Sequence, residues 1–308
     1  MSARYLGPLP THGRFDYRPI TRRPGYRWPG GAGLAVYLGF NLEHFAFGEG
    51  LGAQIGPASP EPDVLNHSWR EYGNRVGAWR CLELFDALAL PTGALINTAL
   101  CGHAPELIDA LVARGDELIG HGHSNAERQG GLAEADERAL LLHCRGLIEA
   151  HGPGTPPAGW LSPWISESRH TPDLLAETGY RYTLNWAHDD QPMRLRTRCG
   201  RGLWSVPYPQ ELNDIPMIVA RQMDAKDFAQ MIVDQFDEMR AQARTMPLVM
   251  GVALHPYLVG QPYRLRHLRR ALEHLVSARD DGDVWFTTPG AICAHVDALA
   301  QDDPAAFG

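Results

Sequence analysis

The chain contains no run of about 18 consecutive apolar residues, the length that a membrane-spanning helix needs. Its first residues, MSARYLGPLPTHGRFDYRP, lack the apolar core of a secretory signal. The five cysteines are scattered and without CxxC spacing, which argues against a disulfide framework or a zinc ribbon. These absences predict a cytoplasmic protein with reduced thiols and no membrane contact.

Basic tracts and nucleotide-binding glycine motifs are also missing. The 28 Lys and Arg residues face 36 Asp and Glu, for a net charge of -8, and no Lys/Arg block favours a nucleic-acid partner. No GxGxxG motif follows the first predicted strand, and the chain has no GxxxxGK[ST] motif. The sequence therefore does not favour an open sheet that binds a nucleotide.

The chain does contain a regular alternation of strands and helices. Apolar runs bounded by turn residues predict buried strands, and apolar residues at helical spacing predict helices between them. The predicted strands are 34–40, 94–100, 117–120, 180–186, 202–206, 248–254 and 284–287, and the helices are 76–88, 105–114, 132–148, 171–178, 224–243, 265–275 and a last one from 291. This order is typical of α/β folds with a parallel sheet. We predict one catalytic domain, 1–308, built as a closed, irregular (β/α) barrel, with 1–31 an irregular N-terminal arm over the domain or a neighbouring subunit.

Polar clusters follow four of the predicted strands. They are Asn41–His44, His121–Glu127, His188–Pro192 and His255–Pro256. In a parallel barrel the reactive side chains gather at the carboxyl ends of the strands. We therefore expect the four clusters to meet at one mouth.

Two kinds of site fit these clusters. A metal site would use Glu43 or His44, His121, either His123 or Asn125, and an acidic residue such as Asp190. An acid/base site would use Glu43 as general base on water and His255 or His121 as general acid, with burial drawing both pKa values toward neutrality. The acid/base site fits these residues better than the metal site does, because asparagine is a poor transition-metal ligand.

Longer segments carry a resemblance to a known family. They are the strand followed by NLEH, GDELIGHGHSNAE, GWLSPWISESRHTPDLLAETGYRYTLNWAHDDQP, VPYPQELNDIP and LHPYLVGQPYR. The chain resembles the polysaccharide deacetylase superfamily, carbohydrate esterase family 4, and more closely the branch of the cofactor-independent allantoinase and cyclic imide hydrolases. Nearly the whole chain is covered. The resemblance implies a distorted or incomplete (β/α) barrel.

The chain departs from the metal-dependent members of that family. Those members carry two aspartates after the first strand, a base and a metal ligand, and two metal-binding histidines four residues apart. Here the aspartates correspond to Asn41-Leu42-Glu43, His121 keeps the first histidine, and Asn125 stands at the second. Leu161 replaces an arginine that often supports the base. The resemblance thus implies that metal is dispensable and that His255 is the general acid.

The leading hypothesis is hydrolysis of a non-peptide C–N bond in a small amide, ureide or cyclic imide. Glu43 activates water, His121 and backbone N–H groups hold the oxyanion, and His255 protonates the leaving nitrogen. The predicted substrate-binding residues are Asn125, Glu127, Trp164, Asp190, Glu211 and Asn213. No cofactor is expected, and the partners are a small-molecule substrate and further copies of the chain in a homo-oligomer.

Two alternatives stay open. One is a metal-dependent N-deacetylase of an acetylated sugar or amine, with zinc held by Glu43, His121 and Asp190, or with His44 or His123 as a substitute ligand. The other is a barrel that binds a metabolite without catalysis.

Overall fold

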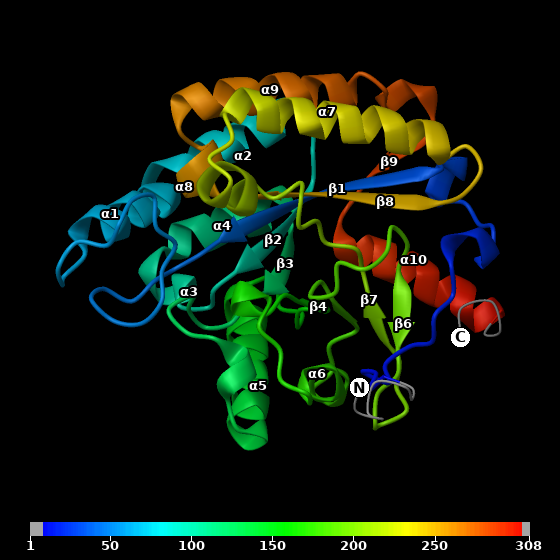
Figure 1. Cartoon of the computed structure of the whole chain (residues 1–308), viewed down its shortest axis with the longest axis horizontal. Helices are drawn as coiled ribbons and strands as arrows, with labels where there is room; N and C mark the ends of the chain where they lie inside the picture. The colour runs from blue at the N-terminus through cyan, green and yellow to red at the C-terminus, as the bar shows by residue number, and fades with distance from the viewer. Residues whose placement is uncertain (1–8, 304–308) are drawn as a thin grey trace, which may run out of the picture.

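The computed structural model describes residues 9–303, in which the strands form a strongly curved sheet flanked by helices (Figure 1). The strands are β1 (Leu34–Leu42), β2 (Thr92–Ile96), β3 (Glu117–Gly120), β4 (Gly159–Trp160), β5 (Tyr182–Thr183), β6 (Met193–Leu195), β7 (Leu203–Ser205), β8 (Leu248–Leu254) and β9 (Val284–Phe286). Their order is β6-β7-β5-β4-β3-β2-β1-β8, with β9 also paired to β1. All described pairs are parallel except β6 with β7. This is a distorted, incomplete (β/α) barrel.

Apolar faces explain why these elements form. Every residue of β1 and of β8 is buried, as expected for strands covered on both faces. The helices are α1 (Val64–Tyr72), α2 (Ala78–Ala87), α3 (Leu100–His103), α4 (Pro105–Arg114), α5 (Glu134–His151), α6 (Thr171–Glu177), α7 (Ala225–Gln242), α8 (Pro256–Val259), α9 (Pro262–Val276) and α10 (Pro289–Asp302). Helices α7 and α9 lie side by side above β1 and β8 (Figure 1). No helix within residues 9–303 is long and apolar enough to cross a membrane.

The alternation of strands and helices is confirmed, although several elements were not predicted. The expectation of a closed barrel is wrong for the described part of the chain, because the sheet runs from β6 to β8 without pairing these two strands. Strands β4 and β6 and helices α3 and α8 were not predicted, since none is long enough to show a period. The nine-residue helix α1 was not predicted either. The part of the predicted arm from residue 9 onward lies over its own domain: Trp28 is buried and donates from Nε1 to the Leu248 carbonyl at 3.0 Å.

The positions of the strand ends determine which of the four predicted polar clusters lie close together. The carboxyl ends of β1, β3 and β8 lie at one edge of the sheet and lead into Glu43, His121 and His255. The fourth predicted cluster is not at that edge. The Val249 N–H, near the amino end of β8, donates to the Asp190 carbonyl at 2.9 Å. The chain turns back after β5, so the prediction that all four clusters share one mouth is wrong.

Candidate active site

Glu43, the first residue after β1, is the centre of a buried polar cluster. Its Oε1 accepts a hydrogen bond from Asn125 Nδ2 and lies 3.5 Å from His121 Nε2 and 3.6 Å from His255 Nε2. Its Oε2 accepts a hydrogen bond from the Tyr257 hydroxyl at 2.5 Å. All five side chains are buried. The structure thus brings together the three side chains predicted to be catalytic, one from each of three strand ends.

His255 is held by a buried carboxylate. Its Nδ1 donates to Asp214 Oδ1 at 2.6 Å, and its backbone N–H donates to Asp214 Oδ2 at 2.7 Å. Burial by itself lowers the pKa of His255, but the charges of Asp214 and Glu43 outweigh this effect and raise the pKa to about 10. At neutral pH His255 is therefore an imidazolium.

Glu43 shows the opposite change. Burial by itself raises the pKa of this carboxyl, but the charge and the hydrogen bonding of His255 lower the pKa well below its usual range. The expectation that burial would bring both pKa values toward neutrality is therefore wrong. The two groups form a buried ion pair, and each stabilises the charged form of the other.

His121 has a defined tautomer. Its Nδ1 lies 2.8 Å from the Leu161 carbonyl oxygen, which can only accept a hydrogen bond, so Nδ1 carries the proton. In a neutral imidazole the Nε2 that faces Glu43 is then an acceptor. His121 can donate to an oxyanion, the role expected from the sequence, only when its ring is doubly protonated.

A second asparagine fixes the orientation of Asn125. Asn97 Oδ1 accepts from the His44 N–H at 2.8 Å, and Asn97 Nδ2 donates to the His121 carbonyl. Asn97 Nδ2 also donates to Asn125 Oδ1 at 3.0 Å. The amide nitrogen of Asn125, rather than its oxygen, therefore faces Glu43.

This arrangement tests whether the family's metal position could hold an ion. A ligand at that position must present a lone pair, but Asn125 presents an N–H group to Glu43 while its oxygen is bound to Asn97. The Tyr257 hydroxyl and the His255 imidazolium also direct protons at the same carboxylate. Glu43, His121 and Asn125 do not fit a metal ion.

Trp164 lies beside this cluster. Its indole N–H donates to the Asn125 carbonyl at 3.0 Å, and the residue is 39% exposed. Trp164 and Ile165 have φ values of 60° and 52°, a conformation that costs energy for residues other than glycine. Such strain is common at functional sites, so Trp164, which contacts Asn125, stays a candidate for substrate contact.

The remaining predicted substrate-binding residues do not join the Glu43 cluster. Glu127 is exposed, two residues beyond Asn125. Asp190 and Glu211 are exposed and line a separate cavity next to the amino-terminal half of β8. Asn213 is buried, but its Oδ1 accepts from the Ile215 N–H at 3.1 Å and so caps its own turn. The zinc set of Glu43, His121 and Asp190 is not assembled.

Sequence reasoning missed Asp214, Tyr257 and Asn97. Asp214 stands in the quoted segment VPYPQELNDIP, next to Asn213, and Tyr257 stands two residues after His255. The signal for Asp214 was chemical: a buried histidine that acts as an acid needs a carboxylate on its other ring nitrogen.

Comparisons with known proteins agree with this fold. No family model matches the chain. The solved structure of PuuE allantoinase superposes with a TM-score of 0.81 at 28% identity, covering 92% of this chain and 98% of the other. A structure from Pseudomonas aeruginosa PAO1, described as a probable polysaccharide deacetylase, gives a TM-score of 0.79 at 27% identity, covering 91% and 95%. The peptidoglycan deacetylase of Helicobacter pylori is 24% identical, covering 82% of this chain and 93% of its own.

In fold and in sequence, the chain is similar to hydrolases of the polysaccharide deacetylase type. These relatives include both deacetylases and an allantoinase, enzymes that cleave C–N bonds other than peptide bonds.

Proposed function

We propose that the protein hydrolyses a non-peptide C–N bond in a small amide, ureide or cyclic imide, by acid/base activation of water. The observation that carries this proposal is the buried pair of Glu43 and His255, held in opposite charge states with Asp214 behind the imidazolium. A pair of titratable groups whose pKa values are driven apart is typical of an acid and a base with separate roles.

Each group has a definite task in this mechanism. Glu43 takes a proton from water, and the water oxygen attacks the carbonyl carbon to form a tetrahedral intermediate. His255 then donates its Nε2 proton to the nitrogen as the C–N bond breaks, while Asp214 holds Nδ1. The proton on Glu43 returns to His255 across the 3.6 Å between Oε1 and Nε2, which restores the ion pair.

The surrounding side chains position the water. Each carboxylate oxygen of Glu43 can accept two hydrogen bonds, so Oε1 can accept from water in addition to Asn125. The Nε2 of a neutral His121, 3.5 Å from this oxygen, is a second acceptor for the same water. The His255 cation favours the negative charge that develops on the intermediate.

The similarity to PuuE allantoinase supports a small cyclic amide or ureide as the substrate class. The similarity to a peptidoglycan deacetylase supports the alternative, an N-deacetylase, but the amide nitrogen of Asn125 stands against metal-dependent chemistry at this site.

The test is hydrolysis of allantoin, succinimide, hydantoin and N-acetylglucosamine by the wild type, Glu43→Gln and the control Glu149→Gln, a similar change on the exposed face of α5. We expect a cyclic substrate to be opened by the wild type and the control, and by Glu43→Gln about 10²- to 10⁴-fold more slowly. Turnover of N-acetylglucosamine alone would favour the deacetylase. No turnover, with binding that Glu43→Gln leaves unchanged, would favour the non-catalytic barrel.

A further inference from the structure

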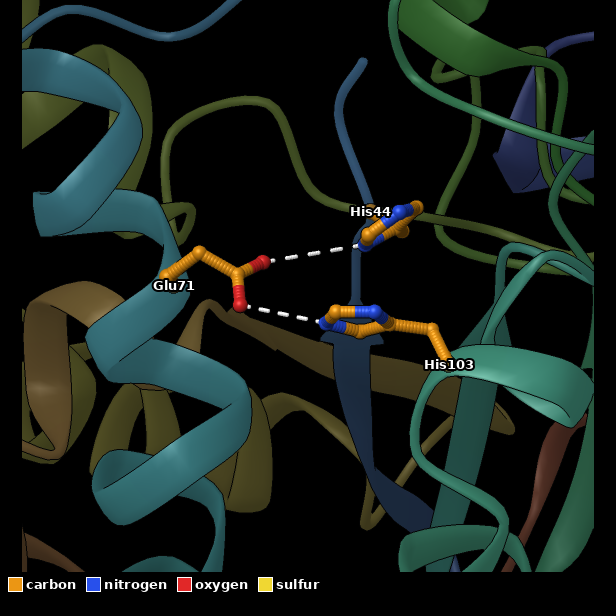
Figure 2. Close-up of side chains that lie close together, drawn as sticks. All are labelled: His44, Glu71 and His103. Atoms are coloured by element: carbon orange, nitrogen blue, oxygen red, sulfur yellow. Dashed lines mark hydrogen bonds and ion pairs between the residues drawn. The ribbon is translucent and has the colours of Figure 1, made fainter. Parts of the chain in front are cut away.

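Three side chains beside the catalytic cluster lie close together and face one another (Figure 2). His44 follows Glu43 at the end of β1, Glu71 lies in the last turn of α1, and His103 ends the short helix α3. His44 Nδ1 lies 3.7 Å from Glu71 Oε1, and His103 Nε2 lies 3.1 Å from Glu71 Oε2. The two imidazole rings are 4.1 Å apart between centroids. Two nitrogens and one carboxylate thus converge on one point.

The spacing matches that of ligands around one metal ion. Zinc binds imidazole nitrogen and carboxylate oxygen at about 2.0–2.2 Å, so two tetrahedral ligands of one ion are separated by about 3.4 Å. The observed separations lie on either side of this value: 3.7 Å from His44 Nδ1 to Glu71 Oε1, and 3.1 Å, a hydrogen bond, from His103 Nε2 to the other oxygen, Oε2. In residues 9–303, this is the one group of three or more His, Cys, Asp or Glu side chains whose ligand atoms all lie within 4.8 Å of one another.

The ring of His44 supplies an independent indication. Its Nδ1 is buried and has no hydrogen-bond partner among the described residues, since 3.7 Å to Glu71 is beyond hydrogen-bonding range. A buried polar atom without a partner is uncommon and calls for an explanation such as a bound ion. His67, one turn before Glu71 on α1, has a buried Nδ1 that also lacks a hydrogen-bond partner among residues 9–303.

We propose that His44, Glu71 and His103 bind one divalent transition-metal ion, with zinc as the expected occupant. Two imidazoles and one carboxylate form a donor set that suits zinc and its neighbours better than magnesium or calcium. The His103 side chain is 40% exposed, which leaves room for water at a fourth position. The ion ties the segment after β1 to α1 and α3.

This site is distinct from the catalytic cluster. Glu43 faces His121, His255 and Tyr257, whereas His44 faces α1 and α3. The proposal does not depend on the hydrolytic function, and its test reads metal binding rather than turnover.

The experiment is calorimetric titration of the metal-free full-length protein with zinc. The wild type is expected to bind one zinc ion per chain, and Glu71→Gln and His103→Gln are expected to lower the affinity by at least about 100-fold. The control His151→Gln removes an exposed imidazole at the end of α5 and should bind as the wild type does. X-ray absorption of the zinc-loaded protein should show two nitrogen ligands from imidazole.

Two results would overturn the proposal. One is a wild type that takes up no zinc. The other is zinc binding that survives Glu71→Gln and His103→Gln but is lost in Glu43→Gln, because the ion would then be bound at the catalytic cluster. Because the His103 side chain is partly exposed, its variant keeps the test decisive if Glu71→Gln does not fold.

Discussion

Replacement of Asp214 by asparagine tests the acid assigned to the site. Both oxygens of Asp214 accept hydrogen bonds from His255, one from the ring Nδ1 and one from the backbone N–H. In Asp214→Asn the remaining oxygen can keep the backbone hydrogen bond, but the new NH₂ group then faces Nδ1. A nitrogen that faces a donor cannot carry a proton, so the His255 proton moves to Nε2 and the imidazolium is lost.

The structure gives the size of the effect. Raising the pKa of His255 from 6.5 to about 10 corresponds to roughly 5 kcal/mol of preferential stabilisation of the imidazolium, which Asp214 and Glu43 supply against the cost of burial. Without the Asp214 charge the pKa of His255 falls. A positioned general acid contributes about 10²- to 10⁴-fold, so we expect kcat/KM at neutral pH to fall by that factor.

The assay is the pH dependence of kcat/KM on the substrate found to be hydrolysed. The wild type should lose activity as pH rises through about 10, and Asp214→Asn should show this alkaline limb at lower pH. The control Asp109→Asn makes the same chemical change on the exposed face of α4. A folded Asp214→Asn protein that keeps the wild-type rate and the wild-type alkaline limb would refute the assignment.

Three further predictions concern Tyr257, His255 and Gly122. Tyr257→Phe removes the hydrogen bond to Glu43 Oε2, so the pKa of Glu43 should rise and the acid limb of kcat/KM should move toward neutral pH; an unmoved limb would contradict this. The pKa of His255 is raised by folding, so its stabilisation is complete below its ordinary value of 6.5, and the free energy of unfolding, measured in urea, should decrease as pH rises through about 10. Gly122 has φ of +71°, and a Cβ there would lie 2.4 Å from Pro163 Cγ, so Gly122→Ala should lower the free energy of unfolding in urea by about 1–3 kcal/mol. The control is Gly200→Ala at an exposed position with φ of +74° and open space around the Cβ, and it should lower the free energy of unfolding less.

The grouping of the candidate catalytic residues was predictable because of where they stand in the sequence. Glu43, His121 and His255 each directly follow an apolar run that is recognisable as a strand, and parallel strands place their carboxyl ends at one edge. The prediction for Asp190 was wrong because most of the apolar run before it is not a strand. The segment YRYTLNW contributes only Tyr182–Thr183 to the sheet, and the chain then turns back to the amino end of β8.

The residues that hydrogen-bond to Glu43 and His255 could not be predicted from the spacing of residues along the sequence. Asp214 and Tyr257 reach Glu43 and His255 through tertiary contacts, and no period or motif in the chain links their positions. The cluster of His44, Glu71 and His103 is similar: two of its members lie on helices that are far from β1 in the sequence. Such partners become visible only when the hydrogen bonds of buried polar atoms are followed in three dimensions.

The most direct test of the account is the rate at which metal-depleted protein opens a cyclic amide. Because we propose a zinc site outside the catalytic cluster, metal content alone does not decide the question, and the assay should include Glu71→Gln, which lacks a ligand of that site. The account predicts that chelated wild type and chelated Glu71→Gln both turn over the substrate as the untreated wild type does. Loss of turnover on chelation, restored by zinc in both proteins, would contradict it and would make Glu43 a metal ligand rather than a base.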